Sequence, residues 1–311
     1  MLHEGRIIAE KNNMKIIDCN YCGFKHIFPL PSDEQIDEFY EKQYYDFKEN
    51  TSRAPDLQRL SKEDSYKKEY EWRCNTLFSD IHTTLVNIKN NKGKICDVGC
   101  GTGDFLKYMD LNGWKCTGVE PSKNVNRIGN FSDINIITSS FQDFVNNHSE
   151  EHHTFDVVTL LNVLEHVVSP VDVIDQVKML LKPKSGILVV MVPNDFSEIQ
   201  NIAREKLDIE PWWIAIPDHI NYFNKKSLKE FLESDDFEII HSTGDFPMEF
   251  FLLQGDNYIG NQELGKECHN KRVEFELALP SELRRSLYQK FAELGIGREI
   301  LIYSKFKGNN E

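Results

Sequence analysis

The sequence has no apolar run long enough to cross a lipid bilayer, which takes about 20 consecutive apolar residues. Its beginning, MLHEGRIIAEKNNMK, lacks the apolar stretch and the small-residue cleavage site of a secretory signal. Cysteine is scarce, and the seven residues form no regular framework of pairs, which is typical of a reducing compartment. We therefore expect a soluble, cytoplasmic protein.

Positive charge is also in short supply. The chain has 36 Lys and Arg against 50 Asp and Glu, for a formal net charge of −14, and no local basic patch interrupts this excess. Nonspecific binding to nucleic acid or to anionic lipid depends on positive charge. We therefore expect neither a nucleic-acid partner nor a membrane partner.

Repeats and low-complexity tracts are absent, and from Lys94 onward short apolar segments alternate with helical patterns. This alternation predicts an α/β fold with a mostly parallel sheet and helices on both faces. The expected strands are KICDV, KCTGVE, INIITS, FDVVTLL, GILVVMV, FEIIHS and REILIYSKF. Five helices are expected between these strands. The first ends near Asn112, the second begins at Pro121, and a short third lies near Phe141. The fourth runs from about Pro170 to Leu181 and the fifth from about Ser227 to Ser234.

Three glycines follow the first of these strands, in the segment 99–103, GCGTG. They do not complete a dinucleotide fingerprint, because Asp104 stands where its third glycine belongs, and no Lys-Ser/Thr pair follows to make a P-loop. Asp97, at the strand end, would repel a pyrophosphate and attract a cation. Glu120, at the end of the second strand, can accept hydrogen bonds from both ribose hydroxyls. These signs favour S-adenosylmethionine, a nucleoside with a cationic amino-acid end; taken alone, the glycines also fit a tight turn without a ligand.

The motifs DVGCGTGDF, VEPS, FDVVTLLNVLEHV and LVVMVPN carry a family resemblance. In order and spacing they resemble the class I S-adenosylmethionine-dependent methyltransferases, over about residues 94–194. The resemblance implies a Rossmann-like seven-stranded sheet whose last strand is antiparallel. It implies that Asn162 lies near the methionine part of the cofactor and that Gln142 and Asp143 lie near the adenine. The full set of cofactor-binding residues expected in this way is Asp97, Gly99, Cys100, Gly101, Thr102, Gly103, Glu120, Pro121, Gln142, Asp143, Leu161 and Asn162.

Two cysteines near the N-terminus, Cys19 and Cys22, form a C-x-x-C knuckle, and a second such pair is missing upstream. Two strands expected around Asn12 would form a hairpin that brings His3 near Cys19, so that His3, Cys19, Cys22 and His26 make a chemically complete tetrahedral zinc site. The segment, with the FPLP and FYEKQYY that follow, resembles the zinc-binding N-terminal part of some sugar methyltransferases of polysaccharide gene clusters. The alternative is that the two cysteines pack a small hydrophobic hairpin.

Four segments follow from these patterns. Residues 1–31 form the zinc-knuckle-like hairpin, and residues 32–90 form a helical linker or cap, with helical spacing at 32–47 and 61–89. Residues 91–243 and 298–307 form the methyltransferase core. The insertion at 244–297, with helices expected near 263–279 and 281–294, shapes an acceptor pocket or a subunit contact, which leaves a homo-oligomer open.

Two histidines fall where ligands of an open α/β sheet bind, beyond the carboxyl ends of the strands. His166 follows the fourth strand, and His219 follows the fifth in PWWIAIPDHINYF. Either imidazole is suited to remove a proton from an acceptor hydroxyl, with His219 preferred and Tyr222 beside it. The aromatic residues of this segment, Trp212, Trp213, Tyr222 and Phe223, are suited to stacking on an apolar or sugar face of a substrate, and core packing is the alternative. A structural role in the LEH turn is the alternative for His166.

Together these observations predict an enzyme that transfers a methyl group from S-adenosylmethionine to a small-molecule acceptor by in-line displacement with a histidine base. The resemblance implies a nucleotide-linked sugar or a glycan precursor as the acceptor. A methyltransferase acting on protein, quinone or tRNA is the first alternative. The second, from a different class, is a noncatalytic cofactor-binding partner in a glycan pathway.

Overall fold

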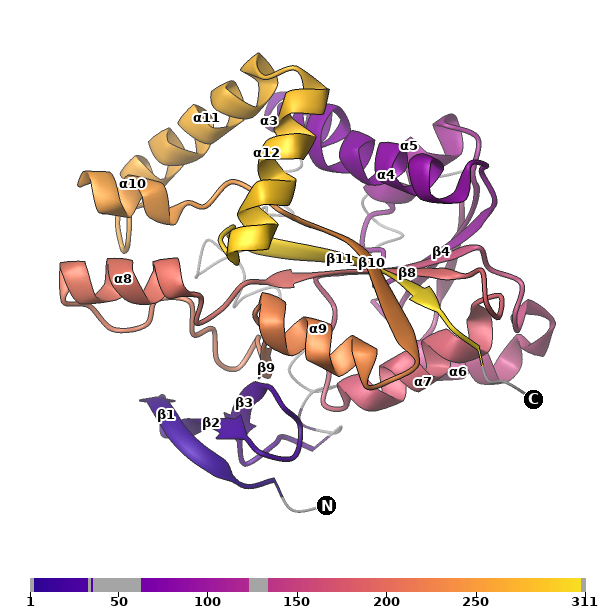
Figure 1. Ribbon diagram of the computed structural model, residues 1–311, viewed down its shortest axis with the longest axis horizontal. Coiled ribbons are helices and arrows are strands. Elements are labelled where there is room, and N and C mark those ends of the chain that lie inside the picture. The colour runs from indigo at the N-terminus through magenta and orange to yellow at the C-terminus, as the bar shows by residue number, and fades with distance from the viewer. Residues whose placement is uncertain (1–2, 33–34, 36–62, 123–133, 309–311) are drawn as a thin grey trace.

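A seven-stranded sheet forms the centre of the computed structural model, which describes residues 3–32, 35, 63–122 and 134–308 (Figure 1). The strand order is β10-β11-β8-β7-β4-β5-β6. Strands β6, β5, β4, β7 and β8 are parallel, and β11 is antiparallel to both neighbours. The strands are β4 (Lys94–Val98), β5 (Lys115–Glu120), β6 (Asn135–Thr138), β7 (Val157–Leu161), β8 (Ile187–Pro193), β10 (Phe237–Gly244) and β11 (Glu299–Phe306). The seven strands expected from the sequence, and the antiparallel last strand, are confirmed.

Helices cover both faces of this sheet, because strands β4, β7 and β8 are apolar on both sides. One face packs against α4 (Ser79–Lys89), α5 (Asp104–Leu111) and α12 (Ser281–Leu294). The other packs against α6 (Phe141–Asn147), α7 (Pro170–Leu180) and α9 (Lys225–Glu233). Each fully buried Leu, Ile, Val or Phe contributes about 1.5–3 kcal/mol to the free energy of folding. The helices on both faces therefore stabilise the sheet, whose strand ends form the site.

The remaining helices lie around the edges of this core. They are α3 (Glu63–Arg73), which continues through the π-helix η2 (Cys74–Phe78) into α4, and η4 (Ser149–Glu151), α8 (Glu198–Leu207), α10 (Glu249–Gln254) and α11 (Gln262–Ala278). The helix expected at 61–89 is confirmed over its described part, and so are the two helices of the insertion. Helices α8 and α10 were not expected. The helix expected at 32–47 lies outside the described residues apart from Ser32 and Gln35, as does most of the helix expected from Pro121.

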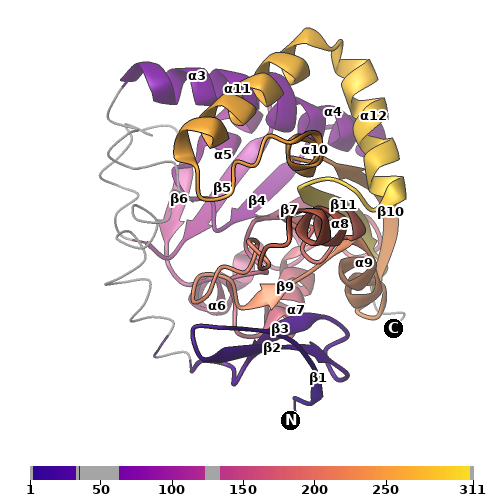
Figure 2. The same cartoon turned by 90° about the vertical axis from the view of Figure 1, so that its left-hand side faces the viewer.

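A second, four-stranded sheet has the order β1-β2-β3-β9. It comprises β1 (Gly5–Lys11), β2 (Met14–Cys19), β3 (Lys25–Phe28) and β9 (Asn221–Tyr222). Asn12 and Asn13 have φ angles of 53° and 62°, as a two-residue hairpin turn requires, so the expected hairpin is confirmed. The segment after the C-x-x-C knuckle forms strand β3. Figure 2 shows this sheet at the opposite end of the molecule from α11 and α12.

Strand β9 joins the N-terminal hairpin to the core. It belongs to the long stretch after β8 that contains His219, and it pairs with β3. Ile16 and Ile27 of the hairpin pack against Trp213, Ile220 and Tyr222 of this stretch. The hairpin therefore supports the segment that carries the expected base. Among the residues that the structure describes, no helix is both long and apolar enough to cross a bilayer.

Candidate active site

The glycine loop connects β4 to α5 in a conformation that other residues would strain. Gly99, Gly101 and Gly103 have φ angles of 68°, 51° and 76°, and Gly103 caps α5. A Cβ atom on Gly99 would lie 2.9 Å from Val163 Cγ2, whereas a Cβ atom on Gly101 would meet nothing within 4 Å. The first of these glycines is thus required by packing, and the middle one leaves an open backbone surface that a ligand can approach closely.

Asp97 lies under this loop, one residue before the end of β4. Its side chain is 3% exposed, and Thr159 Oγ1 on the neighbouring strand β7 donates to Asp97 Oδ1 at 2.5 Å. Burial, with a smaller contribution from the nearby Glu120, raises the pKa of this carboxyl to about 7, although the hydrogen bond from Thr159 opposes the shift. A positively charged group above the loop would relieve this cost.

Glu120 ends β5 and lies against the same loop. The backbone N–H of Gly101 donates to Glu120 Oε2 at 3.0 Å, and the N–H of Ser122 donates to Oε1 at 3.0 Å. Burial raises the pKa of this carboxyl, and the two backbone hydrogen bonds oppose the shift. Each oxygen keeps a second lone pair, so the carboxylate can still accept from two ribose hydroxyls.

Cys100 packs inward from the loop. A Cβ atom on Gly118 of β5 would lie 2.7 Å from Cys100 Sγ, so the two residues are in close contact. Burial raises the pKa of the Cys100 thiol far above its usual range, which keeps it protonated. The side chain therefore packs against β5, and the predicted contact of Cys100 with the cofactor is expected from its backbone.

The other residues expected at the cofactor are spread around the strand ends. Leu161 is the last residue of β7, and Asn162 follows it with a φ angle of 58°. Thr102 is partly buried in the loop, and Pro121, after β5, is exposed. Their places beside the strand ends are compatible with the predicted roles, which stay predictions.

Gln142 and Asp143 lie at the start of α6 and have partners of their own. Asp143 accepts a hydrogen bond from the Ser140 hydroxyl, whose oxygen in turn accepts from the Asp143 N–H, so this pair caps the helix. The Gln142 amide oxygen accepts from Gln176 on α7 at 3.3 Å. Both side chains are exposed, and their expected contact with the adenine stays a prediction.

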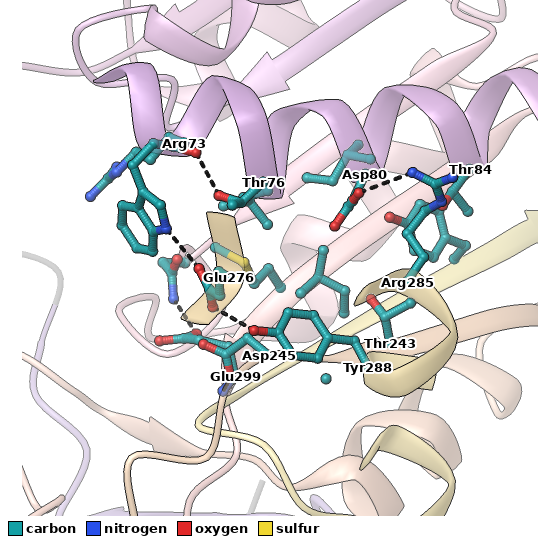
Figure 3. Close-up of a pocket in the computed structure, with 18 of the residues that line it drawn as sticks. Arg73, Thr76, Asp80, Thr84, Thr243, Asp245, Glu276, Arg285, Tyr288 and Glu299 are labelled. Carbon is teal, nitrogen blue, oxygen red and sulfur yellow. Dashed lines mark hydrogen bonds and ion pairs between the residues drawn. The ribbon is translucent and has the colours of Figure 1, made fainter. Parts of the chain in front are cut away.

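A cavity of about 200 Å³ adjoins these strand ends (Figure 3). Asn162, Met191 and Glu299 line it from the central sheet. Residues of α3, η2 and α4 line a second side, and Arg272, Glu276 and Tyr288 of the insertion line a third. The apolar stretch FPMEFF (246–251) of the insertion does not line the cavity. The residue before it, Asp245, does.

A chain of hydrogen bonds crosses this cavity wall. Asn162 Nδ2 donates to Glu299 Oε2 at 2.9 Å, and the Glu299 N–H donates to Asp245 Oδ1 at 2.6 Å. Arg272 Nη2 donates to Asp245 Oδ2 at 2.9 Å, and Arg272 Nε donates to Glu276 Oε1 at 3.0 Å. Sequence reasoning missed this network, although the spacing of Arg272 and Glu276 is that of a helical ion pair.

His166 and His219 come together as expected. Their ring centroids are 4.9 Å apart, and their side chains are 17% and 15% exposed. Asp218 lies between them, with Oδ1 at 3.3 Å from His166 Nδ1 and Oδ2 at 3.9 Å from His219 Nε2. Glu165, which the sequence reasoning passed over although it belongs to the LEH motif, completes the cluster.

The aromatic residues near His219 pack in the core. Trp213, Tyr222 and Phe223 are each 1% exposed, so these rings do not face a substrate. The Tyr222 hydroxyl donates to the His219 backbone oxygen at 3.1 Å. Of the two interpretations of this segment, packing is the one that its burial supports, and Tyr222 is placed to hold the His219 backbone.

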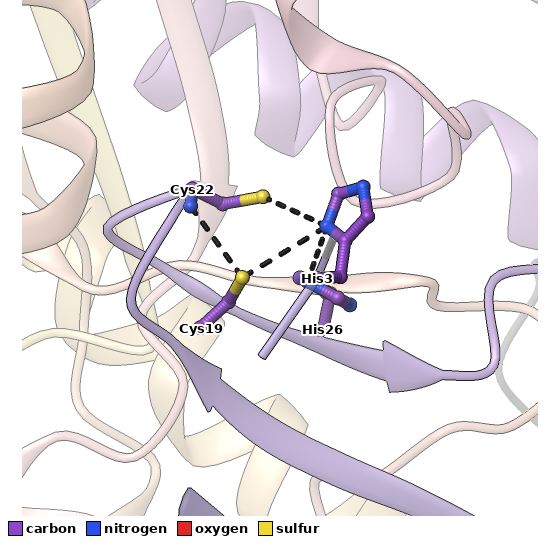
Figure 4. A group of neighbouring side chains, drawn as sticks. All are labelled: His3, Cys19, Cys22 and His26. Carbon is purple, nitrogen blue, oxygen red and sulfur yellow. Dashed lines mark hydrogen bonds between the residues drawn. The ribbon is translucent and has the colours of Figure 1, made fainter. Parts of the chain in front are cut away.

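His3, Cys19, Cys22 and His26 form the second cluster, and one ligand atom from each lies within 4.8 Å of the others (Figure 4). His3 Nδ1 lies 3.4 Å from Cys22 Sγ and 3.2 Å from His26 Nε2. His26 Nδ1 donates to the Ile27 oxygen at 2.8 Å, so the lone pair of the neutral ring is on Nε2, toward His3. Two thiols and two imidazoles at this spacing fit a tetrahedral zinc ion.

Comparison with known proteins decides the family. The model of a family described as "Methyltransferase domain" matches residues 67–242, more than half of the chain. This chain belongs to that methyltransferase-domain family. The matched residues include the glycine loop, Glu120, His166 and His219.

The curated relatives match this family region only in part. A ubiquinone biosynthesis O-methyltransferase of Actinobacillus pleuropneumoniae is 34% identical over 102 residues, which is 30% of this chain and 43% of that protein. One from Haemophilus ducreyi is 32% identical over 155 residues, 45% of this chain and 65% of that protein. The chain thus spans about two fifths of the first of these relatives.

Solved structures of methyltransferases are similar at low identity. An S-adenosylmethionine-dependent methyltransferase from Archaeoglobus fulgidus has a TM-score of 0.48 and 17% identity, covering 74% of this chain and 92% of that one. The plantazolicin methyltransferase BamL, solved with a triazolic desmethylPZN analog and SAH, has a TM-score of 0.49 and 13% identity, covering 89% of this chain and 100% of that one. Likenesses this distant carry no argument about what this chain acts on.

Proposed function

We propose that the protein transfers the methyl group of S-adenosylmethionine to a small-molecule acceptor. The observation that carries this proposal is the pair of carboxylates, Asp97 and Glu120, on either side of a glycine loop that is open at Gly101. A nucleoside with a cationic amino-acid end complements this arrangement, whereas a pyrophosphate would be repelled. Membership of the methyltransferase-domain family supports the same conclusion.

In the proposed complex the cofactor lies over the loop formed by Gly99, Cys100, Gly101, Thr102 and Gly103. Glu120 accepts from the ribose hydroxyls, Asp97 faces the ammonium group, and Asn162 lies near the methionine part. Pro121, Gln142, Asp143 and Leu161 complete the set at the ends of the neighbouring elements. The acceptor then lies beyond the ends of β7 and β8, where Asn162 lines the cavity and the His166 and His219 pair lies outside its lining, so that methyl carbon and acceptor atom can align. Such alignment can supply about 7–11 kcal/mol of the barrier reduction.

The His166 and His219 pair activates the acceptor. As a neutral imidazole, His219 is placed to take the proton of an acceptor hydroxyl, with His166 beside it and Tyr222 holding its backbone. Water must also be excluded from the methyl group, and the insertion at 244–297 covers the cavity for this purpose.

For the acceptor we propose a nucleotide-linked sugar or a glycan precursor in polysaccharide biosynthesis, on the strength of the N-terminal Cys and His cluster. The second candidate is a phenolic quinone precursor. It is favoured by the curated relatives, which are named ubiquinone biosynthesis O-methyltransferases.

The N-terminal hairpin at 1–31 is proposed as a structural zinc module in which His3, Cys19, Cys22 and His26 hold the ion. Its function is mechanical, because β3 pairs with β9 and thereby holds the segment that carries His219. Helices α3 and α4 and the insertion at 244–297 then cover the cavity over a core at 91–243 and 298–307.

The test is a screen with S-adenosylmethionine carrying a labelled methyl group, run against one panel of nucleotide sugars and one of phenolic quinone precursors. Label transferred to either panel supports methyl transfer and chooses between the acceptors. Loss of transfer in His219→Ala with unchanged affinity for the cofactor supports catalysis, and His153→Ala, an exposed histidine, is the control. Tight cofactor binding without transfer to any acceptor would favour a noncatalytic partner instead.

A further inference from the structure

The acceptor side of the site contains a second cluster of metal-ligating side chains. Glu165 and His166 follow β7, and His219 precedes β9, and one ligand atom from each of the three lies within 4.8 Å of the others. Atoms that bind one ion at about 2.1 Å lie about 3–4 Å apart, so only small side-chain rotations separate this cluster from a coordination sphere.

The backbone holds these two segments together before any ligand arrives. The backbone N–H groups of Ile220 and Asn221 both donate to the backbone oxygen of Glu165, at 2.7 and 3.0 Å. Asn221 Nδ2 donates to the oxygens of Leu164 and Val167, at 2.9 and 2.7 Å. Four hydrogen bonds therefore fix the register of the LEH turn against β9, as a preorganised site requires.

The tautomer of His166 suits a ligand. Its Nδ1 lies 2.8 Å from the Asp218 backbone oxygen, which can only accept, so Nδ1 carries the hydrogen. The lone pair of the neutral ring is then on Nε2, which lies 3.8 Å from Glu165 Oε1. A lone pair that faces a carboxylate oxygen at this distance needs a proton or a metal ion between them.

The Glu165 carboxylate is an expensive group to bury without such an ion. Its side chain is 2% exposed, and Oε2 is buried without a hydrogen-bond partner in the described part of the chain. The carboxylate of Asp218 lies against both imidazoles and adds a second negative charge to the cluster. A divalent cation would balance both.

We propose that Glu165, His166 and His219 bind one divalent first-row transition-metal ion. Two imidazoles and one carboxylate suit ions such as Mn²⁺, Co²⁺ or Zn²⁺ and leave coordination positions open. This site is distinct from the thiol-containing cluster of the N-terminal hairpin, which a hard ion such as Mn²⁺ does not favour.

The open positions assign the chemical class of the acceptor, an inference that rests on the proposed methyl transfer. An acceptor hydroxyl bound to the ion loses its proton to solvent more readily. Its oxygen then forms a bond to the methyl carbon while the bond from that carbon to sulfur breaks. The sulfur keeps the electron pair, and the products are a methyl ether and S-adenosylhomocysteine. In this arrangement the acceptor is a hydroxyl compound, and the two histidines are ligands. The ion then takes over the part given above to His219 as a general base, and methyl transfer that depends on the metal distinguishes the two roles.

The test is manganese binding to the full chain, followed by electron paramagnetic resonance, in which free Mn²⁺ is detected and bound Mn²⁺ is largely silent. We expect one bound Mn²⁺ per chain. Glu165→Gln and His219→Asn should each weaken binding more than about tenfold. Glu249→Gln, at another buried carboxylate that has no hydrogen-bond partner in the described part of the chain, should leave it unchanged. Circular dichroism and melting curves establish that each variant is folded.

Two results would overturn the cation site: no Mn²⁺ or Co²⁺ bound outside the hairpin cluster, or unchanged binding in both folded ligand variants. Full methyl transfer in metal-free protein would overturn the role of the ion while leaving the proposed function intact. Failure of S-adenosylhomocysteine to bind would instead refute the proposed function, and the manganese result would still stand by itself.

Discussion

The backbone N–H of Gly101 donates to Glu120 Oε2 across 3.0 Å, so the middle of the glycine loop is fixed to the end of β5. This contact presents an open loop backbone and a carboxylate to the same ligand. Because the carboxylate ends a parallel strand, it lies at the edge of the sheet where nucleosides bind.

Replacing Glu120 should therefore weaken cofactor binding. Glu120→Ala removes the acceptor of the ribose hydroxyls and frees the loop, and we expect the affinity for S-adenosylhomocysteine to fall at least about tenfold, or 1.4 kcal/mol. Glu120→Gln keeps an acceptor for the Gly101 N–H and should lose less. Isothermal titration calorimetry measures both, with the exposed Glu150→Ala as control. Equal affinity in all four proteins would exclude Glu120 from the site.

Asp97 should make cofactor-free protein less stable as the pH rises. Its pKa is raised from 3.8 to about 7, mainly by burial, so between these values the folded state keeps a proton that the unfolded chain has released. Stability then falls across that window, by up to about 4 kcal/mol. Asp97→Asn should melt higher than the wild type at pH 8 and equally at pH 4, yet bind S-adenosylhomocysteine more weakly.

Asp156, a carboxyl whose pKa is lowered where that of Asp97 is raised, serves as the control for Asp97. Hydrogen bonds from the Lys94 N–H and from Lys182, together with Lys89 nearby, lower the pKa of Asp156 despite its partial burial. Asp156→Asn should therefore lower the melting temperature at pH 8. An Asp97→Asn protein that melts below the wild type at pH 8 would contradict the assignment.

Asn221 should be a positioning residue for the acceptor side. Asn221→Ala leaves the oxygens of Leu164 and Val167 without their donor and should cost about 1–3 kcal/mol of stability. Because it loosens the register of Glu165 and His219, we expect kcat to fall while cofactor affinity stays unchanged. Asn201→Ala is the matched control, since Asn201 Nδ2 also donates to two backbone oxygens, those of Phe196 and Ser197. A kcat that falls equally in both variants would indicate a general loss of stability.

Zinc in the N-terminal hairpin should be measurable without any activity assay. We expect one zinc per chain, and cobalt substitution should give the charge-transfer absorption of a thiolate-bound ion. Cys19→Ser should abolish that absorption and lower the melting temperature, whereas Cys116→Ser, in β5, should keep it. Protein that is free of zinc and equally stable in chelator would show that the two cysteines only pack the hairpin.

The sequence allowed the central sheet to be predicted because its strands carry their own signal. Segments such as KICDV and GILVVMV are buried on both faces, so their composition alone marks them as strands of a covered sheet. That the glycine loop lies beside Asp97 and Glu120 could be predicted for a similar reason, since these residues are close in sequence.

The rest depends on contacts between distant segments. Strand β9 has two residues and exists because it pairs with β3, about 200 residues earlier in the chain. Glu165 and Asn221 meet only through the fold, and so do Asn162 and Glu299. The composition around Trp213 suggested aromatic rings that stack on a substrate, but the N-terminal hairpin packs against these rings. Composition alone does not reveal which surface another segment will bury.

A crystal structure of the full chain grown with S-adenosylhomocysteine tests the central claim most directly. We expect the ligand over the glycine loop, with its ribose hydroxyls on Glu120, its amino group toward Asp97 and its sulfur toward the cavity beside Asn162. The ligand bound elsewhere, or the loop occupied by a dinucleotide in its place, would contradict the account.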